Sequence, residues 1–218
     1  FALEFALAEL LQSWGIKPKF VMGHSLGEYV AACVAGVFTL EDGLRLAAAR
    51  GRLMQRLPGA GKMLAVTAEQ TTLDAVMRRF PAIAIAAINS PSQTVLSGAA
   101  DAIDRLQAML QAQGTYCREL TVSHGFHSAQ MEPVLAPLRQ LISKTELQMP
   151  RLCLIGNLHG RAVTTEVTDP DYWCQQTRQP VQFAAGFRAM VQAGCDLFVE
   201  IGPDAIFSFL TQESSSQH

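Results

Sequence analysis

Charge, aromatic side chains and long apolar runs are all scarce in this chain of 218 residues. Only 17% of the residues are charged and 7% are aromatic, and the formal net charge is −2. A charge balance this close to zero gives no reason to expect nucleic acid or an anionic membrane as a partner. No apolar run reaches the ~18 residues that span a bilayer, and no signal peptide is recognisable, so we expect no membrane association.

The cysteines argue against two further classes of protein. They are five in number, which is odd, and no pair has the CxxC spacing of a zinc or redox site. We therefore expect neither a disulfide framework nor a metal ion, and we expect the protein in a reducing cytoplasm. The five are Cys33, Cys117, Cys153, Cys174 and Cys195.

The chain is rich in apolar residues, 49% of the total, and they alternate between strand-like and helix-like segments. This pattern predicts an α/β fold, a hydrolase-like parallel-sheet core with an inserted ferredoxin-like small subdomain. The element order βαββαβ across residues 61–122 indicates the small subdomain. Residues 1–60 and 123–218 then form the large subdomain, with strands expected at 19–22, 152–155 and 197–201.

The most informative motif is Gly23-His24-Ser25-Leu26-Gly27, a G-x-S-x-G pentapeptide between a predicted strand and a predicted helix. In this context the motif builds a nucleophile elbow, with the Ser25 hydroxyl exposed on a tight turn that the two glycines permit. The amide of Leu26, at the start of the helix, is expected to point at an oxyanion on a bound acyl group. A glycine-rich turn with an incidental serine is the alternative.

A serine hydroxyl needs a base within hydrogen-bond distance to become a nucleophile near neutral pH. His24 adjoins Ser25 but lies inside the turn, so its side chain should point away from the hydroxyl. The window from Ser123 to Ser128 follows the last strand of the insertion, where loops gather at a site. We therefore expect His127 to be the general base.

A hydrolase of this fold usually places an acid between the serine and the histidine in chain order. None of the acids in that interval is obviously placed to hold an imidazole, so a backbone carbonyl is the alternative. These acids are Glu41, Asp42, Glu69, Asp74, Asp101, Asp104 and Glu119.

Arg50 lies on the predicted inward side of an alanine-rich helix. Its planar guanidinium is suited to holding a carboxylate by two hydrogen bonds. A surface arginine whose stem covers alanines is the alternative.

Together these residues resemble the acyltransferase domain of a modular type I polyketide synthase, in the malonyl-CoA:acyl carrier protein transacylase family. The resemblance covers essentially the whole chain. It rests on Gly23 to Tyr29, Arg50-Gly51, Asn89-Ser90-Pro91, Ser97-Gly98, His124 to Ser128, Gly156-Asn157, Gly160-Arg161, Tyr172-Trp173, Gln179-Pro180-Val181 and Glu200 to Pro203.

The resemblance implies that Ser25 is the nucleophile, that His127 is the base and that Arg50 binds the carboxylate of the acyl unit. It also implies that the main-chain carbonyl of Gln176 orients the histidine, and that Asn157 is a pocket residue with a weaker role. His24, beside the nucleophile, is included among the substrate-binding residues.

The resemblance further implies a specificity segment at His124-Gly125-Phe126-His127, where the malonyl-type family signature is His-Ala-Phe-His. Phe126 would crowd an α-methyl branch and so favours malonyl over methylmalonyl, and Leu26 points the same way. The glycine at position 125 departs from the signature and could loosen the pocket slightly.

The implied activity is transfer of a malonyl unit from malonyl-CoA to the phosphopantetheine thiol of an acyl carrier protein, in a synthase that also carries domains such as a ketosynthase. No bound cofactor is implied, because the coenzyme A thioester and the phosphopantetheine are substrates. A serine hydrolase or thioesterase and an inactive domain that docks the carrier protein are the alternatives. Family members also carry an upstream Gly-Gln-Gly segment that supplies a second oxyanion donor. This sequence begins after that segment, so we expect it to be a fragment that is poorly active or inactive alone.

Overall fold

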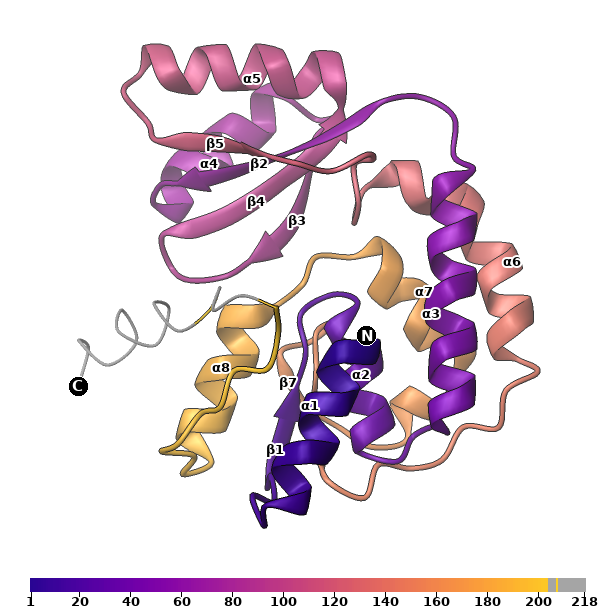
Figure 1. The fold of residues 1–218 in the computed structure, drawn as a ribbon. Coiled ribbons are helices and arrows are strands. Elements are labelled where there is room, and N and C mark those ends of the chain that lie inside the picture. Colours follow the sequence, from indigo (N-terminus) through magenta and orange to yellow (C-terminus); the bar gives the residue numbers. More distant parts are fainter. Residues whose placement is uncertain (204–206, 208–218) are drawn as a thin grey trace.

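The computed structural model describes residues 1–203 and residue 207, and its two sheets belong to two separate subdomains (Figure 1). The fold is α/β, with a ferredoxin-like subdomain inserted into the larger one. The end of the predicted large subdomain, at 204–206 and 208–218, lies outside the described residues. We retain 1–60 with 123–218, and 61–122, as the proposed division of the chain.

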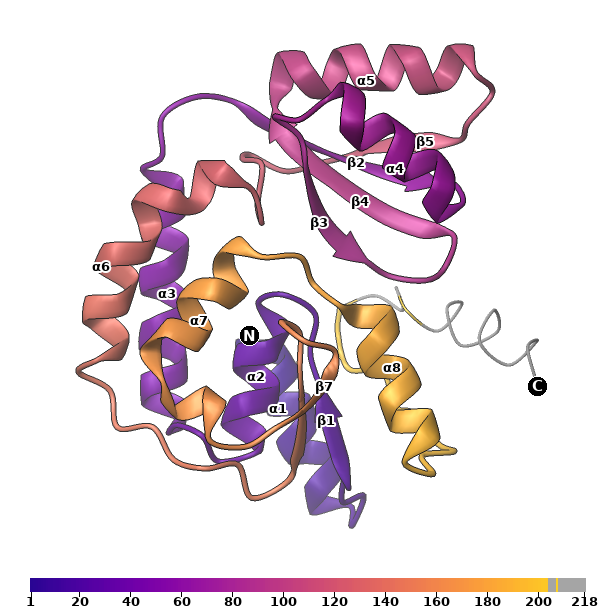
Figure 2. The same cartoon turned by 180° about the vertical axis from the view of Figure 1, so that it is seen from behind.

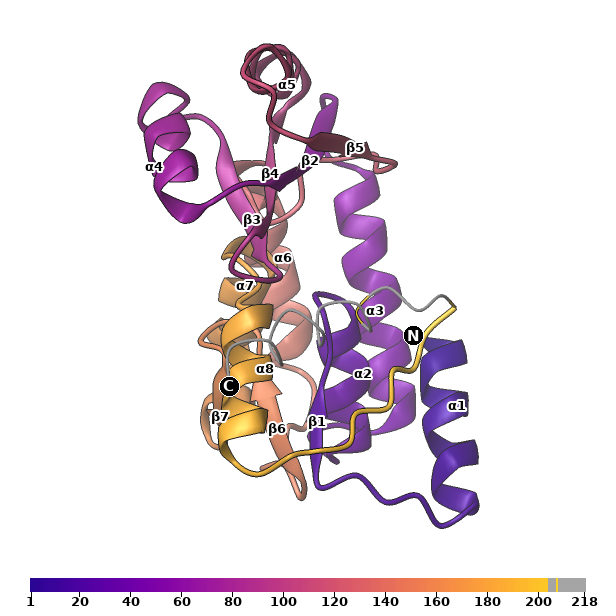
Figure 3. The ribbon, with the colours of Figure 1, turned by 90° about the vertical axis from the view of Figure 1, so that its left-hand side faces the viewer.

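The small subdomain has a four-stranded antiparallel sheet in the order β3-β4-β2-β5. Successive side chains of β2 point to opposite faces of the sheet, as in any strand. Leu64 and Val66 pack with α4 and α5 on one face, whereas Met63 packs toward the large subdomain. The elements are β2 (Gly61–Thr67), α4 (Gln70–Arg79), β3 (Ala84–Ile88), β4 (Gln93–Ala99), α5 (Ala100–Ala112) and β5 (Cys117–Leu120). Figure 3 shows α4 and α5 on the side away from the rest of the chain.

The large subdomain is organised on a three-stranded sheet in the order β1-β6-β7. β1 (Phe20–Met22) pairs in parallel with β6 (Cys153–Gly156), at the two strands predicted for 19–22 and 152–155. β7 (Arg161–Val163) pairs antiparallel to β6 and was not predicted. The strand predicted at 197–201 is wrong: the segment pairs with no other described strand, and an apolar extended segment becomes a strand only with a hydrogen-bonded neighbour.

Helices surround this sheet, and several begin at a side-chain cap. Thr39 accepts a hydrogen bond from the Asp42 amide at 3.1 Å, as expected of the N-cap of α3. Asp169 accepts from the Asp171 amide at 2.9 Å in the same way. The helices are α1 (Ala2–Ser13), α2 (Gly27–Val34), α3 (Leu40–Gln55), α6 (Glu132–Ile142), α7 (Pro170–Arg178), α8 (Phe183–Gln192) and the 3₁₀ turns Ala129–Met131 and Glu166–Thr168.

The two subdomains are joined by backbone hydrogen bonds as well as by apolar packing. Val181 accepts a hydrogen bond from the Ile88 amide and donates one to the Ala86 carbonyl, both at 2.9 Å. Val181 and Phe183 also pack into an apolar cluster with Met63 from the small sheet. In Figure 2 the segment between α7 and α8 passes beneath β3. This junction fixes the small subdomain over the loops that follow β1 and precede α6.

Candidate active site

The nucleophile elbow connects β1 to α2, and Ser25 adopts a left-handed backbone with φ of +54°. The first glycine of the motif is required by sterics, because a Cβ at Gly23 would lie 1.9 Å from the Gly27 carbonyl carbon. The second is not required for space: a Cβ at Gly27 would meet nothing within 4 Å. The interpretation that both glycines allow the tight turn is therefore correct for Gly23 only.

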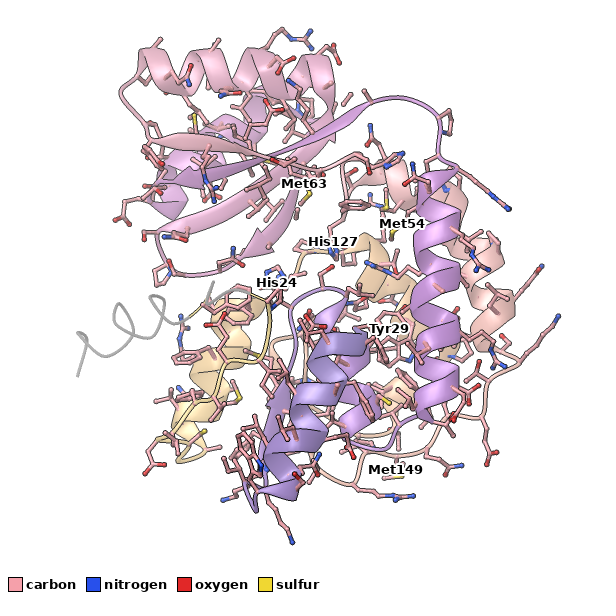
Figure 4. The ribbon with its side chains drawn as sticks, viewed as in Figure 1. His24, Tyr29, Met54, Met63, His127 and Met149 are labelled. Carbon is pink, nitrogen blue, oxygen red and sulfur yellow. The ribbon has the colours of Figure 1, made fainter. Side chains whose placement is uncertain are left out.

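His127 lies directly against the serine, although 102 residues separate them in sequence. Its Nε2 is 2.8 Å from the Ser25 Oγ. His127 also has a left-handed backbone, with φ of +57°, and these two are the only non-glycine residues with positive φ in the described part of the chain. Figure 4 shows His24 and His127 between the small sheet and α2. A serine hydroxyl and an imidazole nitrogen thus lie within the distance that proton transfer requires.

A backbone carbonyl occupies the place where many serine hydrolases have an acid. The Gln179 carbonyl is 2.9 Å from His127 Nδ1, so this nitrogen donates to it and Nε2 is left to accept the Ser25 proton. The resemblance implied the carbonyl of Gln176 instead, which is wrong by three residues. The Gln176 carbonyl contributes only a minor effect that raises the pKa of the same ring.

The surroundings of His127 keep its imidazole neutral. Burial, reinforced by the positive charge of Arg50, lowers the pKa of His127 to about 3. The Gln179 carbonyl opposes this shift only partly. A neutral imidazole is the form that can accept a proton, and His127 is in that form throughout the physiological pH range.

Asn157 and Gln176 hold the elbow backbone rather than lining a pocket. The Asn157 Oδ1 accepts from the Ser25 amide at 2.8 Å, and its Nδ2 donates to the Gly23 carbonyl at 2.7 Å. The Gln176 Nε2 donates to the Ser25 carbonyl at 2.8 Å. Three side-chain hydrogen bonds therefore fix the strained conformation of the nucleophile, a stabilisation that such a backbone requires.

The Leu26 amide donates no hydrogen bond to any group in the described residues. Leu26 is the residue immediately before α2, so its amide lies at the positive end of the helix. This free donor, next to the Ser25 hydroxyl in sequence, is the feature on which the oxyanion interpretation depends.

Arg50 lies on α3 and is buried, with 7% of its surface exposed. Its guanidinium carbon is 5.8 Å from the centre of the Tyr29 ring, and its Nε has no hydrogen-bond partner among the described residues. Burial lowers the pKa of Arg50, and the neighbouring Tyr29 and Glu28 partly offset this. A buried guanidinium without an ion pair is costly, so it is suited to bind an incoming carboxylate.

His24 points away from the Ser25 hydroxyl, toward the small subdomain. Its Nε2 is 2.9 Å from the Asn89 Oδ1, and its ring lies 5.4 Å from that of Phe183 and 5.0 Å from that of Phe207. Burial lowers the pKa of His24, so the ring is neutral. Its observed contacts are those of a link between the elbow and β3.

The predicted specificity segment lies at the junction of the two subdomains. His124 is buried, with Nε2 3.3 Å from the Leu57 carbonyl. Phe126 packs on the core of the large subdomain and on the apolar cluster at the junction. A Cβ at Gly125 would lie 2.7 Å from the Gln130 Oε1 and 2.9 Å from the Gly98 carbonyl. The missing methyl group thus faces β4 and Gln130, and the interpretation that it loosens an acyl pocket is wrong.

Replacing Gly125 with alanine is expected to lower the stability by about 1–3 kcal/mol without broadening the range of acyl groups accepted, because the new methyl group overpacks the junction. Thermal unfolding and acyl-CoA competition measure the two effects. Gly51→Ala is the matched control, since a Cβ there meets nothing within 4 Å on α3. An unchanged melting temperature together with acceptance of branched acyl groups would contradict the assignment.

Two residues at the site were missed by the sequence interpretation. Glu28 is completely buried and accepts a hydrogen bond from the Tyr172 hydroxyl. Gly156 leaves room for that hydroxyl, because a Cβ there would lie 2.2 Å from it. The available signal was an acid at the start of an otherwise apolar helix.

Among the described residues, no group of three or more His, Cys, Asp or Glu side chains could hold a metal ion. Within the same part of the chain, no helix combines the length and apolarity needed to cross a membrane.

A serine elbow with a histidine base and a free oxyanion donor is typical of enzymes that carry an acyl group on serine. A family model described as the acyl transferase domain matches residues 1–217. The chain belongs to this acyl transferase domain family.

The curated relatives are much longer proteins. The chain is 42% identical over 215 residues to the spectinabilin polyketide synthase system protein NorB of Streptomyces orinoci, which covers 98% of the chain and 10% of that protein. It is 40% identical over 210 residues to the PKS-NRPS hybrid synthetase acdB of Aspergillus candidus, and the match covers 94% of the chain and 8% of that protein. The chain thus spans about a tenth of these relatives.

Solved structures agree with this assignment. The acyltransferase domain from the second module of the salinomycin polyketide synthase has a TM-score of 0.93 at 40% identity, over 99% of this chain and 51% of that one. FabD from Acinetobacter baumannii has a TM-score of 0.91 at 27% identity, and the match covers 97% of this chain and 70% of FabD.

Proposed function

We propose that this chain transfers a malonyl unit from malonyl-CoA to the phosphopantetheine thiol of an acyl carrier protein, through an acyl group on Ser25. The observation that carries the proposal is a serine–histidine pair at 2.8 Å together with a buried arginine that forms no ion pair within the described part of the chain. The charge of Arg50 acts on His127, so the arginine and the base share one electrostatic environment.

In the first half of the reaction, the Ser25 Oγ attacks the thioester carbonyl while its proton passes to His127 Nε2. The carbonyl oxygen becomes an oxyanion, and the Leu26 amide donates to it. The carbon–sulfur bond then breaks, and the departing coenzyme A sulfur takes the proton from His127. The products are free coenzyme A and malonyl-Ser25.

In the second half, the carrier-protein thiol gives its proton to His127 Nε2 and its sulfur attacks the ester carbonyl of malonyl-Ser25. The bond to Ser25 Oγ breaks, and Oγ recovers the proton from His127. Both half-reactions use the same neutral imidazole, so the enzyme ends in its starting state. No metal or prosthetic group takes part in either half.

The preference for a malonyl unit follows from Arg50, because a free carboxylate in an apolar site is too costly without a cationic partner. A related solved structure supports a substituted malonyl group as the kind of ligand. The acyltransferase domain of SpnD, 34% identical with a TM-score of 0.89, is described in complex with 2-(pent-4-yn-1-yl)malonyl. Phe126 and Leu26 are proposed to favour the unbranched malonyl unit.

The partners proposed are malonyl-CoA, the acyl carrier protein and neighbouring synthase domains such as a ketosynthase, in the cytoplasm. Hydrolysis by a thioesterase is the competing reaction. It is disfavoured because water is a much weaker acid than a thiol and so depends more on the base, while the carbonyl that holds His127 stabilises the imidazolium less than a carboxylate would.

The test measures where the acyl group goes. The full-length protein is incubated with malonyl-CoA, and its intact mass is followed before and after addition of a phosphopantetheine thiol. We expect a malonyl adduct that persists in water, moves to the thiol and is absent in Ser25→Ala. Release of free malonate as fast as coenzyme A would overturn transfer in favour of hydrolysis.

A further inference from the structure

A cluster of buried polar atoms lies among α2, the helix that follows the nucleophile elbow, and the helices α3 and α7. In the described residues, six buried side-chain atoms have no hydrogen-bond partner, and five of them belong to residues of α2, α3 and α7. These five are Glu28 Oε2, Tyr29 OH, Arg50 Nε, Gln176 Oε1 and Thr177 Oγ1. Such atoms cost free energy, so their concentration at one place calls for a functional explanation.

Glu28 is at the centre of this cluster. Its carboxyl accepts a hydrogen bond from the Tyr172 hydroxyl on α7, across 144 residues of sequence. The Asn157 amide and the Gln176 side chain also stabilise its ionised form. The same two residues hold the backbone of Gly23 and Ser25, Asn157 through its side-chain amide and Gln176 through its Nε2.

We propose that ionised Glu28 is a positioning residue for Ser25. Its carboxylate orients Tyr172, Asn157 and Gln176, and the last two transmit this order to the elbow. An ionised carboxylate only accepts hydrogen bonds, whereas a protonated carboxyl group has one oxygen that carries a proton and acts as a donor. The Tyr172 hydroxyl, the Asn157 main-chain amide and the Gln176 Nε2 are donors, so protonation of Glu28 withdraws an acceptor from them and loosens the nucleophile. The inference rests on Ser25 being the nucleophile, as in the proposed function.

The pH at which this occurs separates Glu28 from the base. Burial raises the pKa of Glu28 to about 7, against the hydrogen bonds from Tyr172, Asn157 and Gln176 and the charge of Arg50, all of which lower it. Arg50 on α3 and Tyr172 on α7 are the charged and titratable groups that act on it, and its neighbour Tyr29 responds to its charge. His127, with a pKa of about 3, cannot produce a change near pH 7.

The pKa of Glu28 sets the direction in which pH changes the positioning of Ser25. Glu28 is ionised above its pKa, so the nucleophile is well positioned at pH 8 and becomes less so as the pH falls through about 7. An amide at position 28 does not titrate. Its NH2 group is a donor, so Glu28→Gln places a donor against the donors of its neighbours at every pH.

The test measures the pH dependence of Ser25 acylation in the full-length protein from pH 5.5 to 8.5. Single-turnover release of coenzyme A from malonyl-CoA gives the rate, and labelling by a fluorophosphonate gives the reactivity of the serine independently of any acyl-CoA. In the unmodified protein, we expect the acylation rate to fall as the pH is lowered through about 7, which gives the pH profile an acid limb. In Glu28→Gln the limb should vanish and the rate at pH 8 should fall roughly 10- to 100-fold, with KM for malonyl-CoA little changed.

Tyr172→Phe removes one donor and should shift the limb without abolishing it. Glu41→Gln, at an exposed glutamate on α3, should keep the profile of the unmodified protein. A limb that persists in Glu28→Gln, or a loss confined to KM, would overturn the inference and leave the proposed function standing. Failure of both reagents to modify Ser25 would overturn both proposals.

Discussion

Replacing His127 with alanine is expected to slow acylation of Ser25 by roughly 10²- to 10⁴-fold, the usual contribution of a general base. The imidazole is the group at hydrogen-bond distance from the Ser25 Oγ, and its lowered pKa keeps the ring unprotonated, so the Nε2 lone pair is free. Binding of malonyl-CoA should change little, because His127 acts on the hydroxyl. Single-turnover release of coenzyme A measures the rate, and the substrate dependence of that rate measures binding.

His159→Ala is the matched control for this experiment, since His159 is exposed in the segment between β6 and β7. Its removal should leave the acylation rate unchanged. A His127→Ala variant that acylates at a normal rate would show that the base is another group.

Replacing Arg50 with alanine is expected to reduce malonyl loading by roughly 10²-fold or more, whereas acetyl loading should survive. Two charge-assisted hydrogen bonds to a carboxylate would be lost, each worth about 1.5–3 kcal/mol. The acetyl group carries no carboxylate, so it loses nothing equivalent. Competition between malonyl-CoA and acetyl-CoA, read by the mass of the acyl-enzyme, measures the change in preference.

Arg52→Ala is the control, because Arg52 lies two residues away on α3 with its side chain exposed. It should load malonyl as the unmodified protein does. An unchanged malonyl preference in Arg50→Ala would contradict the assignment of the arginine.

Local patterns predicted much of the fold and of the site. The βαββαβ order across 61–122 was readable because short, mostly apolar strand segments are separated by helices that each have an apolar face. The elbow was readable because its geometry is set within five residues. Ser25 and His127 needed only a motif and a loop position, and the structure brings them to 2.8 Å.

What the sequence did not predict depends on tertiary contacts. The acceptor for His127 is Gln179 rather than Gln176, because α7 ends at Arg178 and the carbonyl after the helix is the one that faces the ring. β7 has three residues, too few for a visible alternation. The role of Asn157 depends on a contact with Gly23 across 134 residues, which no local pattern encodes.

The left-handed backbones of Ser25 and His127 lower the stability of the fold at the two positions proposed to carry the activity. A non-glycine residue in this region costs about 1–3 kcal/mol, and the surrounding hydrogen bonds must supply it. Glycine at either position would relieve the strain, and a selection for thermal resistance alone would favour that change. With Ser25 and His127 in the proposed roles, such a change would remove the nucleophile or the base. Engineering this domain for durability therefore has to exclude these two positions and draw its stabilising substitutions from sites remote from the elbow.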